Sequence, residues 1–188
     1  MTPAFHLSRT TQAVAHLLKL HHAKQVGKLR LVKLLYIAER ESLAEYKLPI
    51  TSDTPFAMKQ GPILSTTHSL LRDVGNEGDL AYWTRFIGVD GTEVFLKEDP
   101  GHGKLCKAIR AKIEEVHKRF KDVEDEELIE ATHQFAEWRK SWDIRGNKGS
   151  IEFSWEDALA AQGVSEEDIR RVREECALKE KLDHLATR

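Results

Sequence analysis

The chain has 188 residues, of which 40% are hydrophobic and 32% charged, a composition typical of a globular protein with one domain. No stretch approaches the roughly 18 consecutive apolar residues of a membrane-spanning helix, and the N-terminus lacks the basic and apolar regions of a secretory signal. Together with two cysteines that form no CxxC motif, these features predict a cytoplasmic protein with reduced thiols and no membrane contact.

The formal net charge of −2 hides a difference between the two halves of the chain. Residues 1–75 carry ten Lys and Arg against five Asp and Glu, whereas residues 76–188 carry 19 against 26. A basic half can meet nucleic acid or an acidic protein, or the two halves can attract each other within one domain. The basic residues are scattered and lack interleaved aromatic residues, which favours attraction within the domain.

Two helices are predicted first, over residues 9–24 and 28–46, with Gly27 between them. The second has apolar residues around most of its circumference, which predicts a central, mostly buried helix. Two helices that meet at a glycine raise the alternative of a helix-turn-helix. A recognition helix needs a polar face for the DNA groove, however, so this pattern makes nucleic-acid binding the weaker interpretation.

The next stretch, YKLPITSDTPFAMKQGPIL at residues 46–64, holds three of the five prolines. Pro49 ends the preceding helix. Segment 54–59 has the pattern of a short strand, and Pro55, which offers no amide donor, must lie at a sheet edge or at the start of the strand. Gly61 permits a backbone turn that other residues resist, and Pro62 excludes a central strand. A short helix is predicted after Ser65, its candidate N-cap.

Residues 80–98 show the clearest strand pattern, with two β-rich runs around a turn at Val89, Asp90 and Gly91. This pattern predicts an antiparallel hairpin, and segment 54–59 is a candidate third strand beside it. The rest is predicted to be helical, with a loop at 145–150. These helices are expected at 105–120, 125–142, 154–162 and 166–186.

The predicted fold is therefore mainly α, a compact multi-helix domain with a small antiparallel sheet. The domain is expected over residues 1–145. Residues 146–188 form a helical extension that packs on the domain or contacts a partner. The last helix carries a thin apolar stripe on a charged rod, which also leaves a homodimer open. The stripe consists of Ile169, Val172, Cys176, Leu182 and Leu185.

No catalytic or metal-binding motif stands out. The chain lacks a phosphate-binding glycine loop, paired CxxC motifs, an HExxH sequence and a nucleophile elbow. Nine histidines raise a metal alternative, but His102, four residues before Cys106, lies between glycines, and a metal site needs three or four supported ligands. Cys106 is expected on the apolar side of its helix, where a thiol is inert. We therefore expect no enzyme, no metal and no cofactor.

Several short motifs follow one another in a defined order. They are KLLY with Lys33 and Tyr36, the pair Pro49-Ile50, the run Lys59-Gln60-Gly61-Pro62, the helix after Ser65, and THQFAEW at residues 132–138. In this order they closely resemble the signature region of the SocA-like family, also called the Panacea antitoxin domain. The resemblance covers roughly residues 9–140. It departs from the family pattern at Lys47, where glycine is expected, and at Thr132, where serine is common.

The resemblance implies an antitoxin of a bacterial or phage toxin–antitoxin pair. Such a protein would bind and mask a cognate toxin encoded next to it. Two alternatives stay open: a proteolytic adaptor that delivers a partner protein to a protease, and a DNA-binding transcriptional regulator.

Candidate site residues follow from the same motifs. Lys33, Tyr36, Gly61 and Pro62 are expected to be structural. Lys59, Gln60, His133 and Trp138 are expected on or near the toxin-binding face, although His133 and Trp138, with Gly61 and Pro62, can also be purely structural. Trp138 and Trp142 share one helix face, where they either fill the core or anchor a partner.

Overall fold

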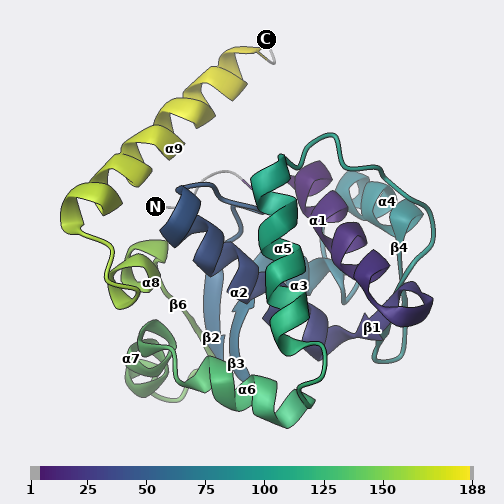
Figure 1. The fold of residues 1–188 in the computed structure, drawn as a ribbon, viewed down its shortest axis with the longest axis horizontal. Helices are drawn as coiled ribbons and strands as arrows, with labels where there is room; N and C mark the ends of the chain where they lie inside the picture. Colours follow the sequence, from purple (N-terminus) through teal and green to yellow (C-terminus); the bar gives the residue numbers. More distant parts are fainter. Residues whose placement is uncertain (1–4, 187–188) are drawn as a thin grey trace.

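Helices form most of the protein in a computed structural model that describes residues 5–186, and the side chains of residues 5–178 (Figure 1). The prediction of a mainly helical domain with antiparallel strands is confirmed, although the strands form two small sheets. In chain order the elements are α1 (Leu7–Leu20), η1 (His22–Lys24), β1 (Gln25–Gly27), α2 (Lys28–Tyr46), β2 (Pro55–Met58), β3 (Gly61–Leu64), α3 (Ser65–Leu70), α4 (Glu77–Phe86), β4 (Ile87–Asp90), β5 (Glu93–Leu96), α5 (Lys107–Phe120), α6 (Asp125–His133), α7 (Ala136–Ile144), β6 (Ser150–Glu152), α8 (Trp155–Ala161) and α9 (Glu166–Ala186).

Helix α2 lies at the centre of the fold, in contact with α1, α5, α6, α8 and β3 (Figure 1). Every residue from 31 to 39 in this helix is buried, including the two charged residues Lys33 and Glu39. The prediction of a central, mostly buried helix is confirmed. The central turns of α2 therefore have no polar face to lay in a DNA groove, which argues against α2 as a recognition helix.

The first sheet has the order β1-β5-β4 and contains the predicted hairpin, which turns after Asp90. The prediction of strand structure from residue 80 is wrong, because residues 80–86 belong to α4. Asn76 caps this helix by accepting a hydrogen bond from the Asp79 amide. Trp83 and Phe86 face the core, so tertiary packing prevails over their β propensity.

The second sheet has the order β3-β2-β6. Strand β2 confirms the predicted strand near residues 54–59, but it pairs with β3 and β6 and not with the hairpin. Pro62 lies in β3, an edge strand, where a missing amide donor is tolerated. Strand β6 begins at Ser150, within the predicted loop, and is too short and polar to stand out from the sequence alone.

The predicted helix at 125–142 is two helices, α6 and α7, with a break at Gln134 and Phe135. No glycine or proline marks the break. Phe135 is extended, and the Arg40 guanidinium lies 4.2 Å from the centre of its ring. The break therefore arises from tertiary packing, which the periodicity of residues 125–142 does not reveal.

The extension at 146–188 begins with elements that pack on the domain. Strand β6 pairs with β2, and Trp155 of α8 is buried and stacks on Tyr36 at a centroid distance of 5.6 Å. Helix α9 contacts α8 and projects away from the body (Figure 1). Val172 and Cys176 of the predicted stripe are buried. The side chains of Leu182 and Leu185 lie outside the described part.

Candidate functional site

The motif residues meet at the β2–β3 turn, where Lys59 and Gln60 are exposed between the paired residues Met58 and Gly61. Gly61 has a φ of +96°, a conformation that L-residues with side chains rarely adopt. A Cβ atom there would lie 2.5 Å from Thr132 Oγ1 and 2.7 Å from Lys33 Nζ. Only glycine therefore lets the turn fit so closely against α2 and α6.

Lys33 lies beneath this turn and is 1% exposed. Its Nζ donates a hydrogen bond to the Pro62 carbonyl oxygen at 2.9 Å. Among the described residues, no carboxylate lies close enough to pair with this ammonium group. Burial lowers the pKa of Lys33 from 10.5 to about 7, because it removes water from the charge without supplying an acid.

An aromatic stack packs against the same turn. The rings of His133 and Trp138 are parallel with centroids 4.2 Å apart, and Trp138 stacks in turn on Trp142 at 5.8 Å. The Trp138 indole Nε1 donates to the Met58 carbonyl oxygen at 3.0 Å, and the Arg145 guanidinium lies 3.5 Å from the centre of the Trp142 ring. Trp138 is thus a buried anchor of the turn, whereas Trp142 lies partly exposed at the rim.

Tyr36 ties α7 to α2 behind the stack. Its hydroxyl donates to Glu137 Oε1 at 3.0 Å, and Arg40 Nε pairs with the same oxygen at 2.5 Å. Burial raises the pKa of Tyr36, and the negative charge of Glu137 adds to the effect, although Arg40 opposes it. The hydroxyl therefore stays neutral and acts as a hydrogen-bond donor.

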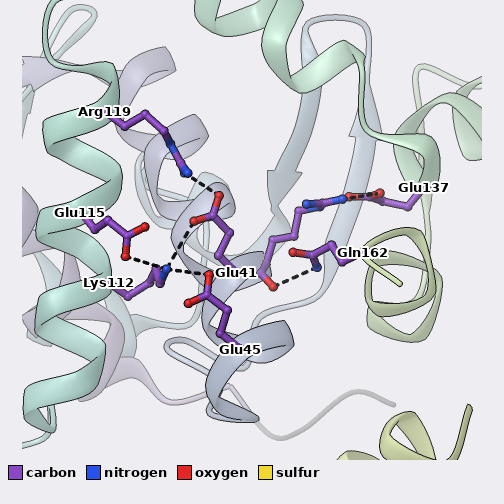
Figure 2. A network of polar contacts seen from close by, with 8 residues as sticks. Glu41, Glu45, Lys112, Glu115, Arg119, Glu137 and Gln162 are labelled. Carbon is purple, nitrogen blue, oxygen red and sulfur yellow. Dashed lines mark hydrogen bonds and ion pairs between the residues drawn. The ribbon is translucent and has the colours of Figure 1, made fainter. Parts of the chain in front are cut away.

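A second polar network joins α2 to α5 on another side of α2 (Figure 2). Lys112 of α5 is 0% exposed, and its Nζ lies 2.8 Å from carboxylate oxygens of Glu45 and Glu115 and 3.7 Å from Glu41. Arg119, which lies on α5 like Lys112, pairs with Glu41 of α2. Burial acts to lower the pKa of Lys112, but the bonds to Glu115 and Glu45 outweigh it, so the pKa is raised.

Two buried acids that the motifs do not include fix the linker after α2. Glu39 is 0% exposed and accepts hydrogen bonds from the amides of Ile50, Thr51 and Ser52. Asp53 accepts from the amides that begin α3. Burial raises the pKa of Glu39 to about 7, although the hydrogen bonds of Thr51 oppose it. An acid within the apolar run of residues 31–39 is the sequence signal that could have identified Glu39.

Other candidates in the sequence lead elsewhere. Cys106 is exposed just before α5, so its prediction as a buried residue is wrong. In the part of the chain that the structure describes, no group of three or more His, Cys, Asp or Glu is arranged to hold a metal ion. None of the helices described there is long and apolar enough to cross a membrane.

The structure thus brings the predicted motif residues together around one turn. Lys33 and Tyr36 lie on α2, Gly61 and Pro62 in β3, and His133 and Trp138 where α6 meets α7. Lys59 and Gln60 form the exposed tip. Each motif contributes a contact to this turn or to the helices that hold it.

Comparison with known proteins gives one match. The family model described as "Antitoxin SocA-like, Panacea domain" matches residues 31–139, which is more than half of the chain and spans α2 to α7. No curated protein matches the chain, and no solved structure does. The matched region contains every motif residue named above. The chain therefore belongs to the SocA-like antitoxin family and carries its Panacea domain.

Proposed function

We propose that this protein is the antitoxin of a toxin–antitoxin pair and neutralises its toxin by direct binding. The family membership supports the antitoxin role. The observation that carries the choice of surface is the exposed Lys59-Gln60 tip, which is held rigidly by Gly61 and by the bond of Trp138 to Met58. A surface that is already ordered loses little conformational entropy when it binds.

The proposed binding face consists of this tip and the exposed rim of α7. Lys59 and Gln60 contact the toxin, while the buried Trp138 and the stacked His133 position the tip and the rim. Trp142 and Arg145 at the rim are of the residue types that dominate interface energies. Ile144 is 69% exposed and adds apolar surface beside them. A stable complex needs about 1,600 Å² of buried surface in total, so the toxin must extend beyond these residues.

The first experiment is paired expression with the neighbouring open reading frame. The neighbour is induced alone and then together with this protein, and growth and co-purification are scored. We expect the neighbour to be toxic alone, rescued by co-expression and recovered in a stable complex. Rescue without a complex would contradict direct neutralisation. Rescue with loss of the toxin, restored when proteases are removed, would favour the adaptor.

Substitutions then test the face. A Lys59→Glu/Gln60→Ala variant should fail to rescue growth and lose the complex while its melting temperature stays within about 2 °C of wild type, since both side chains are exposed. Lys107→Glu, at an exposed position at the start of α5, is the control for the charge change. Equal rescue by both variants would place the toxin elsewhere.

A further inference from the structure

A pocket of about 590 Å³ lies beside the turn, between the start of α2, the β2–β3 turn and the C-terminal end of α3. Apolar side chains such as Leu29, Val32 and Ile63 form part of its wall. Every charged side chain that lines it is basic. These are Lys28, Lys33, Lys59 and Arg72, with His68 beside them.

The positive charge of this pocket is not neutralised within the described residues, since none of its four cations forms an ion pair there. The first turn of α2 contributes to the same field, because it has no acidic residue and no side-chain cap on its positive end. The pKa of His68 is lowered by burial and then by Arg72, Lys28 and Lys33, so these cations act on one small volume.

Lys33 is the most unusual of these cations because it is almost completely buried. A buried ammonium group is normally paired with an acid. This one has the Pro62 carbonyl oxygen as its hydrogen-bond acceptor among the described residues. An anion in the pocket would supply the missing charge.

We infer that this pocket accepts a carboxylate of the toxin, either an Asp or Glu side chain or the C-terminal group, flanked by an apolar residue. The inference rests on the proposed function, because it assigns the toxin as the occupant. Lys33, Lys59 and Arg72 bind the carboxylate, and the apolar wall holds the neighbouring side chain. Lys59 links the pocket to the proposed binding face, so one toxin segment can occupy both.

The residues that line the pocket favour a peptide over nucleic acid as its occupant. Single-stranded nucleic acid binds to basic grooves that carry aromatic side chains, on which the bases stack. Among the described residues, no Phe, Tyr or Trp side chain lines this pocket, and part of its wall is apolar. A carboxylate with an apolar neighbour matches both the charge and the wall.

The test compares toxin affinity between variants, with the co-purified partner as the probe at pH 7 and fixed salt. Lys33→Met keeps the length of the side chain and removes the charge, and should weaken binding by about tenfold or more without lowering the melting temperature. Lys107→Met, at an exposed position on α5, a helix that contributes no residue to the pocket lining, is the matched control and should bind as wild type does. Arg72→Gln, also exposed, should weaken binding several-fold and serves if Lys33→Met does not fold.

Zero-length carbodiimide cross-linking locates the carboxylate. Mass spectrometry should find an amide bond between an acid of the toxin and Lys33, Lys59 or Lys28, and duplex DNA should not displace the toxin. Unchanged affinity in Lys33→Met and Arg72→Gln, or cross-links only at other lysines, overturns the inference but leaves the antitoxin function standing. Displacement by DNA also overturns it. If the wild-type protein forms no complex at all, both proposals fail.

Discussion

Lys112 and Lys33 are both almost completely buried, but they lie in opposite electrostatic surroundings. Lys112, between α5 and α2, pairs with carboxylates of Glu45 and Glu115 and lies near Glu41. Lys33, between α2 and β3, donates to the carbonyl of Pro62 and has no acid beside it in the described chain. The pKa is accordingly raised for Lys112 and lowered to about 7 for Lys33.

The two lysines therefore distinguish an interface that neutralises its buried charge with its own residues from one that does not. The α2–α5 interface satisfies its buried charge internally, so Lys112 holds two helices together. The α2–β3 interface keeps a charge that its own residues do not neutralise, next to a pocket that other cations also line. Because an unpaired buried charge opposes folding, Lys33 is expected to reduce stability in the free protein.

The largest expected effect comes from filling the space above Lys33. Gly61→Ala should lower the free energy of unfolding by about 3–5 kcal/mol, because the new methyl group meets Thr132 and Lys33 in a strained backbone conformation. Chemical denaturation measures this. Gly91→Ala is the control, since Gly91 has a φ of +54° and open space around it, and should cost about 1 kcal/mol. Equal losses in the two variants would mean that close packing at Gly61 contributes nothing.

Replacement of each of the two lysines by Met should change the free energy of unfolding in opposite directions. Lys112→Met leaves several carboxylates facing one another and should destabilise the fold by about 1–3 kcal/mol, a value reduced because two of the acids are half exposed. Lys33→Met removes an unpaired charge and should stabilise by about 1 kcal/mol. Melting temperatures would then move by about 2–4 °C per kcal/mol in opposite directions. A drop for both would show that Lys33 has a stabilising partner.

A smaller effect is expected from pH. Between pH 7 and 10.5 the unfolded chain keeps a proton on Lys33 that the folded chain releases, so this residue makes stability rise with pH in that window. The raised pKa of Glu39 has the opposite effect, with stability falling as pH rises from 4.5 to about 7. Glu39 therefore titrates below the pH range in which Lys33 changes stability. The gain in melting temperature of Lys33→Met over wild type should shrink from pH 7 to pH 9. A constant gain would contradict a lowered pKa.

The sequence predicted best where local pattern and tertiary structure agree. The apolar run around Leu34 predicted the central helix, and Gly61 predicted the turn, although strand β3, which begins at Gly61, was not predicted. Residues 80–86 were predicted as strand but form a helix, and the break at Phe135 was not predicted. The packing of Trp83 decides the first, and the stacking of Arg40 on Phe135 decides the second. These contacts join residues far apart in the chain, and no local pattern reports them.

The candidate site was predicted in part for the same reason. The motifs named the residues around the turn, but not the pocket beside it. His68 and Arg72 were not among the predicted site residues, and they reach Lys33 only because α3 folds back beside the start of α2. That Lys33 has no acid close by also depends on every neighbouring element, so it cannot be predicted from the KLLY sequence.

The aromatic stack gives this protein a built-in optical probe. Trp83 and Trp155 are 1% exposed and Trp138 is 7% exposed, so of the four tryptophans Trp142 is the one partly open to solvent. Indole emission shifts to shorter wavelength when water is removed from the ring. A partner that covers the rim of α7 should therefore change the fluorescence through Trp142, and binding at this face can be followed without attaching any label.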